Sequence, residues 1–268
     1  MPTSSDRRLC NLLGSLSPQD RPRTAAQPSS SGAEEDIISI MAGLKDFDSP
    51  TIFNAVEKVL GDATPSRFYT DHTIVNLLPE LGSFIGRAVT VEVTTNDPDA
   101  RVAAGENTFQ EYYDTLDATP GPIVAVMKDI DSAPGRGASF GDGMARRHRL
   151  SNVTGALIDG TVRDLAGIRR VGLPVLAWGK VPGHGPFAAK RTNVELTVGD
   201  LVVKPGDILF GDEDGVVSVP VERAAEVLVE CATVRQMEGG IFASTLTPSV
   251  FTDPRPLGKQ QFVLVKKD

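Results

Sequence analysis

The chain has few of the residues that build disulfide frameworks and soft metal sites. Its 268 residues include two cysteines, Cys10 and Cys231, whose number and context fit neither a disulfide framework nor a thiolate zinc site. The three histidines, His72, His148 and His184, show no HxH or HExxH spacing, which argues against a histidine-rich metal centre. A metal ion here would be held by oxygen atoms, and that favours Mg²⁺ or Mn²⁺ over Zn²⁺.

Long apolar runs and excess positive charge are also missing. No apolar run approaches the roughly 20 residues that a membrane-spanning helix needs, so we expect no membrane segment. The net charge of −8 and the pI near 5.0 argue against nucleic acid or an anionic membrane as a partner, because both attract a basic face. Sparse cysteine and the absence of a secretory signal favour a reducing compartment, and we expect a cytoplasmic protein.

Composition divides the chain into three parts. Residues 1–35 are rich in Ser, Pro, Arg and Gln without an apolar period, so we expect a disordered N-terminal extension. Its arginines and serines also resemble an organelle transit peptide, although Asp6 and Asp20 interrupt that pattern. Residues 36–240 have the periodic apolar segments of a folded domain, and residues 241–268 form a Pro-rich C-terminal extension.

The order of apolar segments within the domain predicts an α/β fold. Alternating or buried runs predict strands at 86–95, Ile123–Met127, Ala156–Ile158 and Val175–Trp178. Helical periodicity predicts a first helix with Ser49 as its N-cap and Pro50 in its first turn, and further helices over Phe109–Leu116, Gly141–Leu150, Leu165–Val171 and about 221–238. This order indicates βαβ units around a central, partly parallel sheet, followed by an antiparallel meander over 194–219.

The segment GALIDGTVRDLAG, residues 155–167, is the first candidate for chemistry. A buried strand ends here and Arg163 and Asp164 follow it, at the end of the strand where open α/β sheets build their sites. Asp164 offers a carboxylate to a hard cation, and the guanidinium of Arg163 suits a substrate carboxylate. The alternative is structural, with Asp164 capping the next helix and Arg163 as a solvated charge.

The segment SFGDGMARRHRL, residues 139–150, is the second candidate. Gly141 and Gly143 leave backbone amides unobstructed at a helix start, which is a natural cradle for a carboxylate or phosphate. Asp142 either caps this helix or holds metal-bound water. The basic run 146–149 predicts a solvated helix face, and a minor alternative makes His148 a phosphoryl carrier.

Two further groups of polar residues have weaker claims. The acidic residues around the turns PGD and GDEDG are typical of turn sequences, and we interpret them as structural: Asp207, Asp212, Glu213 and Asp214. His184 lies in a glycine-rich loop that could close over a site, where it could serve as an acid or a base.

Three segments in this order resemble the RraA-like family, which includes the 4-hydroxy-4-methyl-2-oxoglutarate aldolases and the regulators of ribonuclease E activity. They are Gly141-Asp142 at a helix start, GALIDGTVRD from Gly155 to Asp164, and PGDILFGDEDGVVSVP from Pro205 to Pro220. The resemblance covers about residues 40–240 and makes 36–240 an RraA-like catalytic domain. It implies a three-layer sandwich similar to the swivelling phosphohistidine domain, with a mixed central sheet, assembled as homotrimers or hexamers with sites between subunits.

The resemblance also implies a role for each matching residue. Gly141, Asp142, Gly143 and Met144 would form the substrate-binding turn, with the amides of Gly143 and Met144 on the pyruvyl carboxylate. Arg163 would bind the same pyruvyl unit and stabilise the enolate. Asp164 would ligate the metal directly, Asp142 would act through water, and Glu238 is the candidate for the glutamate that relatives supply from an adjacent subunit. The pair Gly143-Met144 departs from the family pattern, where bulkier aliphatic residues are usual.

The implied activity is that of a class II aldolase that uses Mg²⁺ or Mn²⁺. Such a lyase cleaves 4-hydroxy-2-oxo acids to pyruvate and decarboxylates oxaloacetate through the same pyruvate enolate, which the metal and Arg163 stabilise. The alternative is a non-catalytic regulator that binds a ribonuclease or another protein. A phosphotransfer module that uses His148 is a third reading.

Overall fold

A computed structural model describes residues 30–61, 66–96, 108–245, 251–252 and 263–264. The chain divides into two compact units, Met1–Glu35 and Asp36–Asp268, and the sheet lies in the second. Most of the expected N-terminal and C-terminal extensions lies outside the described residues. None of the helices in the described ranges is long and apolar enough to cross a membrane.

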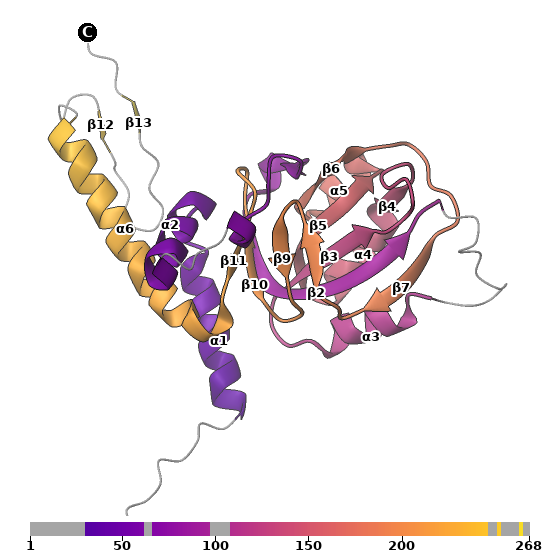
Figure 1. The fold of residues 1–268 in the computed structure, drawn as a ribbon, viewed down its shortest axis with the longest axis horizontal. Helices are drawn as coiled ribbons and strands as arrows, with labels where there is room; N and C mark the ends of the chain where they lie inside the picture. The colour runs from indigo at the N-terminus through magenta and orange to yellow at the C-terminus, as the bar shows by residue number, and fades with distance from the viewer. Residues whose placement is uncertain (1–29, 62–65, 97–107, 246–250, 253–262, 265–268) are drawn as a thin grey trace, which may run out of the picture. The chain divides into compact units, whose positions relative to one another are not determined.

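A curled mixed sheet of nine strands forms the centre of the domain (Figure 1). Seven strands follow in the order β1 (Val75–Asn76), β6 (Val175–Lys180), β5 (Val153–Val162), β3 (Ile123–Asp129), β2 (Phe84–Thr94), β10 (Ile208–Gly211) and β11 (Val216–Val219). Two more pair beside this path, β4 (Ala138–Phe140) with β5 and β7 (Ala188–Thr192) with β2. Strands β2, β3, β5 and β6 run parallel, so their carboxyl ends meet at one edge.

Alternation along the strands divides the sheet into two buried faces. Along β3, Ile123, Ala125 and Met127 join one core, whereas Val124 and Val126 join the other. The first core is covered by α3 (Gln110–Ala118), α4 (Asp142–Leu150) and α5 (Leu165–Val171). The second is covered by the hairpin β8 (Leu196–Val198) and β9 (Leu201–Val203). The two faces explain why the central strands are apolar throughout.

A third core lies where three helices pack against β10 and β11. They are α1 (Ser30–Leu44), α2 (Ser49–Leu60) and α6 (Ala224–Thr245), and from Ile37 onward α1 contributes apolar side chains to this core. The buried guanidinium of Arg235 on α6 donates to Asp48 at 3.0 Å. Asp48 is the N-cap of α2 and accepts from the Thr51 amide, so the expectation that Ser49 caps this helix is wrong by one residue.

Most predicted elements are confirmed, with shifted ends. The helix predicted over Leu165–Val171 has those bounds, and the four predicted strands are present. The antiparallel strands predicted over 194–219 are present, but they form two separate hairpins, β8–β9 and β10–β11, in place of one meander, and only β10–β11 joins the main sheet. Helix α1 precedes the first helix that the sequence predicted, and α6 continues past 238.

The remaining described elements are short. Helices of the 3-10 type span Ser66–Phe68, Pro79–Leu81 and Val221–Arg223. Strands β12 (Phe251–Thr252) and β13 (Val263–Leu264) pair with each other.

The sheet and the helices that cover it confirm the mixed α/β class predicted from the sequence. The likeness to the phosphohistidine domain stays a prediction.

Candidate active site

One cavity of about 230 Å³ gathers both sequence segments singled out for chemistry. It lies where β4 leads into α4 and β5 leads into α5. Its walls are Ala138, Ser139, Phe140, Gly141, Asp142, Gly143, Met144, Arg163, Asp164, His184 and Phe187. The predicted substrate-binding turn and the predicted Arg–Asp pair thus face one space.

Arg163 and Asp164 form the turn between β5 and α5. The Arg163 amide donates to the Phe140 carbonyl at 2.9 Å, which ties this turn to the start of α4. The Arg163 Nε lies 3.3 Å from Asp164 Oδ2, and both side chains remain partly exposed, at 37% and 44%. The ion pair is open to solvent, so it contributes little to stability and its charges remain available to a ligand.

The expectation that Asp164 serves only as a helix cap is not met. Asp164 occupies the N-cap position of α5, but its side chain makes no capping hydrogen bond. Its backbone is left-handed, with φ of 59°, a conformation in which Asp and Asn are the usual non-glycine residues. The carboxylate therefore faces the cavity from a turn that disfavours most other side chains.

The first turn of α4 presents unfilled backbone donors to the same cavity. Gly141 is its N-cap, and no side chain within the described ranges caps this helix. The first amides of a helix lack intrahelical acceptors and lie at the positive end of its dipole, so this terminus favours an anion. A Cβ on Gly141 would lie 3.0 Å from Asp164 Oδ2, whereas one on Gly143 would have no heavy atom within 4 Å. Gly141 therefore permits the close approach of the two segments.

Gly167 on α5 fixes where Asp142 can lie. A Cβ at this position would stand 2.4 Å from Asp142 Oδ2 and 2.5 Å from Asp142 Cβ. Helices α4 and α5 can therefore pack with the Asp142 side chain between them only because residue 167 has no side chain. No pattern in the sequence singles out Gly167 beyond its place in GALIDGTVRDLAG.

His148 is buried, so the prediction that it lies on a solvated basic face is wrong. Its Nδ1 donates to the Met144 carbonyl at 2.7 Å, since a carbonyl oxygen can only accept, and its Nε2 then accepts from the Tyr112 hydroxyl at 2.9 Å. Burial lowers the pKa of His148 to about 4. With both nitrogens engaged and no exposed surface, the ring cannot reach a phosphoryl donor, which rules out the phosphotransfer reading.

His184 and Phe187 close another side of the cavity. They lie on the loop between β6 and β7, and Phe187 stacks on Phe109 with ring centroids 4.8 Å apart. The His184 Nδ1 lies 2.9 Å from the Gly185 carbonyl oxygen. Because a carbonyl oxygen can only accept, Nδ1 is the donor of this hydrogen bond.

The remaining acidic candidates lie elsewhere. Glu238 lines an acidic pocket with Asp48, Asp212, Glu213 and Asp214, whereas Asp164 lines the cavity described above. Within one chain Glu238 is therefore not part of the Arg163–Asp164 cavity. Asp212 accepts from the amide and hydroxyl of Ser49 at 2.7 Å each, as expected for a structural turn residue.

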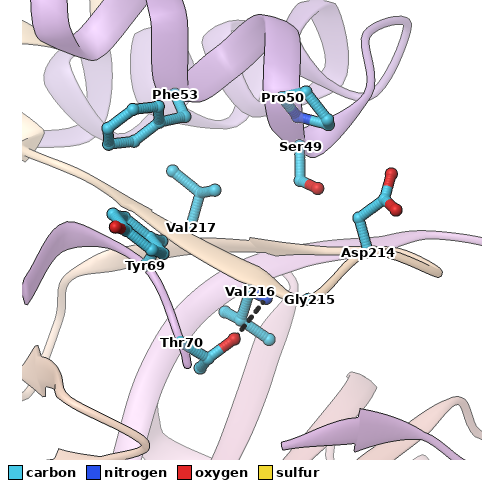
Figure 2. Close-up of a pocket in the computed structure, with 9 residues that line it drawn as sticks. All are labelled: Ser49, Pro50, Phe53, Tyr69, Thr70, Asp214, Gly215, Val216 and Val217. Atoms are coloured by element: carbon cyan, nitrogen blue, oxygen red, sulfur yellow. Dashed lines mark hydrogen bonds between the residues drawn. The ribbon is translucent and has the colours of Figure 1, made fainter. Parts of the chain in front are cut away.

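An apolar pocket of about 320 Å³ lies between α2 and β11 (Figure 2). Phe53 and Tyr69 face each other edge to face with centroids 4.9 Å apart, and the Thr70 hydroxyl accepts from the Val216 amide. Asp214 is the one ionisable acid in its wall and no Arg or Lys accompanies it. This pocket lacks the paired opposite charges of the cavity around Arg163.

Two carboxylates of the Arg163 cavity fit a hard divalent cation. Asp164 and Asp142 are oxygen donors in one wall, and the described residues contain no cluster of three His, Cys, Asp or Glu side chains that could enclose a metal. Mg²⁺ is often bound by one or two carboxylates and completes its shell with water and substrate. These two carboxylates are the residues that could hold Mg²⁺ or Mn²⁺ in this cavity, and they do not form a closed zinc site.

Similarity to known proteins places the chain in a family. The profile of the RraA-like family, described as Aldolase/RraA, matches residues 51–218. The chain belongs to the RraA-like family. An uncharacterised protein of Methanocaldococcus jannaschii is 26% identical over 196 residues, which cover 73% of this chain and 83% of that protein.

Two other relatives show the range of the family. A Halalkalibacterium halodurans protein provisionally named as a 4-hydroxy-4-methyl-2-oxoglutarate aldolase is 27% identical over 156 residues, 56% of this chain and 66% of that protein. The structure of Streptomyces coelicolor RraAS2, described as an unusual member of the RNase ES inhibitor RraA protein family, matches with a TM-score of 0.61 and 22% identity. That match covers 76% of this chain and 96% of RraAS2. The family thus includes proteins named as aldolases and proteins named as ribonuclease inhibitors.

Proposed function

We propose that the protein is a divalent-metal-dependent lyase that cleaves 4-hydroxy-2-oxo acids to pyruvate and decarboxylates oxaloacetate. One observation carries the proposal: the open N-terminus of α4 and the Arg163–Asp164 pair line one cavity. A 2-oxo acid has a carboxylate beside a carbonyl. The amides at the start of α4 would donate to the carboxylate, and the carboxylates of Asp164 and Asp142 would hold a metal ion beside the carbonyl. The aldolase names of relatives near 27% identity agree with this chemistry.

Binding of the 2-oxo acid begins with its carboxylate at the α4 terminus. The amides of Gly143 and Met144 would donate to the carboxylate oxygens, as an anion at a helix N-terminus requires. Gly143 carries no Cβ and is exposed, so a ligand can approach its amide closely. Met144 forms part of the apolar wall and helps exclude water from the reacting carbons.

Arg163 would stabilise the negative charge that develops when the C3–C4 bond breaks. The electrons of that bond pass onto the 2-oxo oxygen and give the enolate of pyruvate. A guanidinium already held in the cavity wall needs little rearrangement to offset this charge. Asp164 would hold Mg²⁺ or Mn²⁺ directly and Asp142 through water, and the bound cation would supply Lewis-acid polarisation of the 2-oxo carbonyl.

Cleavage also requires removal of a proton from the C4 hydroxyl. His184 lines the cavity, and the hydrogen bond of its Nδ1 to the Gly185 carbonyl leaves Nε2 as the nitrogen that could take up a proton. We assign it as the acceptor of that proton. Oxaloacetate decarboxylation needs no such base, so replacement of His184 by Gln should lower aldol cleavage more than decarboxylation.

Assembly is a separate part of the proposal. We propose a homotrimer or hexamer in which Glu238 approaches the Arg163 cavity of an adjacent subunit. Within one chain Glu238 and the Arg163 cavity lie apart, so Glu238 could reach such a cavity only in a neighbouring subunit. Light scattering should give a mass near three or six times 28.5 kDa. A monomer would contradict this part and leave the cavity to act alone.

The test is pyruvate release from oxaloacetate and from 4-hydroxy-4-methyl-2-oxoglutarate with Mg²⁺ or Mn²⁺, and again with EDTA. The variant is Asp164→Asn, because Asn tolerates the left-handed backbone whereas Ala would add strain. Asp200→Asn is the matched control, since Asp200 is another exposed aspartate with positive φ, at 62°, in the β8–β9 turn. Loss of a metal ligand should lower kcat/KM by at least about a hundredfold, and the control should retain it.

Two results would count against the lyase. Full activity of Asp164→Asn would show that Asp164 is not the metal ligand. No pyruvate from either compound, together with a stable ribonuclease in pull-downs, would favour the regulator that the second group of relatives represents.

A further inference from the structure

A second cavity adjoins the first at Arg163 and Asp164. It has a volume of about 470 Å³ and is lined by Arg163, Asp164, Leu165, Lys180, Val181 and Pro182. The two cavities share the Arg163–Asp164 pair and have different walls beyond it. The Arg163–Asp164 pair is therefore a wall common to both cavities.

Lys180 is the second cation of this cavity, beside Arg163. It ends strand β6, and its Cα is paired with that of Val162, the residue before Arg163. The hydrogen bond from the Val181 amide to the Val162 carbonyl, 3.0 Å long, holds the two chains together at this point. The position of Lys180 next to Arg163 is thus set by the ladder between β5 and β6.

The ammonium group of Lys180 has no acidic partner. In the described part of the chain, no carboxylate lies within 4.0 Å of it, whereas Lys58 and Lys128 each pair with an acid. The neighbouring walls are apolar or belong to the Arg163–Asp164 pair. A lysine left unpaired in a cavity, in a protein of net charge −8, offers a specific place for an anion.

We infer that Lys180 binds the distal carboxylate of a dicarboxylic 2-oxo acid and makes the protein selective for dicarboxylates over monocarboxylates. This rests on the proposed function, because it assumes that the 2-oxo carboxylate lies at the α4 terminus. The substrate would then span both cavities, with one carboxylate at each end and the 2-oxo group beside Arg163. Lys180 acts in binding only and takes no part in bond cleavage.

The test compares two ligands that differ only in the distal group. 2-Oxoglutarate and 2-oxopentanoate have the same number of carbons, and neither carries the 4-hydroxyl that cleavage requires. Titration calorimetry in Mg²⁺ buffer would measure both on the wild type, Lys180→Met, Lys180→Arg and the control Lys190→Met. Lys190 is also exposed, but it lies on β7 and lines neither cavity.

The wild type should bind 2-oxoglutarate about fivefold more tightly, the size expected of a solvent-accessible ion pair. Lys180→Met should abolish the difference without changing the affinity for 2-oxopentanoate, and Lys180→Arg should restore it. Lys190→Met should behave as the wild type does.

Other results separate this inference from the proposed function. An unchanged preference in Lys180→Met, or no preference in the wild type, overturns the role of Lys180. A Lys180-dependent preference in a protein that releases no pyruvate upholds the inference and overturns the lyase. Failure of the wild type to bind either ligand overturns both.

Discussion

Acid should destabilise this protein through His148 in particular. The folded-state pKa is about 4 and the ordinary value is 6.5, so between these values the unfolded chain binds a proton that the folded chain refuses. The contribution of His148 to the unfolding free energy is therefore fully present above about pH 6.5, decreases as the pH falls below that value, and is lost by about pH 4. A difference of about 2.5 pKa units corresponds to roughly 3 kcal/mol of unfolding free energy.

To isolate the effect of His148, the pH dependence of the unfolding free energy is compared with that of a variant that keeps the packing but lacks the imidazole. In the double variant His148→Phe, Tyr112→Phe both partners of the 2.9 Å hydrogen bond are replaced by apolar groups of similar shape. Urea denaturation at a series of pH values from 7.5 to 4 would give the unfolding free energy of each protein. The wild type should lose about 3 kcal/mol more than the double variant across the window, with a slope difference near 1.4 kcal/mol per pH unit. Parallel profiles would show that His148 is not the group responsible.

Three further predictions concern packing, recognition and reactivity. Gly167→Ala should lower the melting temperature by roughly 2–8 °C and weaken 2-oxo acid binding. The steric cost of the new methyl group against Asp142 exceeds the free energy gained from the higher helix propensity of Ala. Gly143→Ala, with open space around it, should leave the melting temperature nearly unchanged. Arg163→Lys should lower kcat/KM by roughly tenfold or more, since a single ammonium cannot reproduce the planar set of donors that the guanidinium offers to the enolate. Cys231 should resist alkylation until the protein unfolds, because burial raises its pKa to about 12, and peptide mapping would follow it.

Each of these predictions has a clear contrary result. A Gly167→Ala protein as stable as the wild type would mean that α4 and α5 separate without cost. Unchanged kinetics in Arg163→Lys would show that charge alone suffices at that position. Rapid labelling of native Cys231 would show that α6 detaches readily from its core.

The sequence predicts the central elements well where local and tertiary signals agree. Helix Leu165–Val171 has the predicted bounds because a strand ends directly before it and Gly172, in a left-handed conformation, ends it. The strands at the centre are unbroken apolar runs because both faces of the sheet are covered. The gathering of Arg163 and Gly141 in one cavity follows from parallel strands ending at one edge.

The errors arise where tertiary contacts decide. His148 stands among three arginines, so the pattern indicates a solvated face, yet the Tyr112 hydroxyl on another helix satisfies the ring and allows its burial. The spacing of the buried residues Ala145 and His148, one helical turn apart, was the available signal. Lys180 could not be singled out because strand pairing, not sequence distance, brings it next to Arg163.

The Arg163 cavity is assembled from a short length of chain. All of its lining residues lie between Ala138 and Phe187, and none comes from α2 or α6. This stretch forms its cavity through contacts of small sequence separation, which speeds the formation of a structure during folding. Substitutions in α2, and in α6 away from Glu238, can accumulate without altering the walls that the chain's own residues form, so the segment is a natural unit for transfer between relatives by recombination.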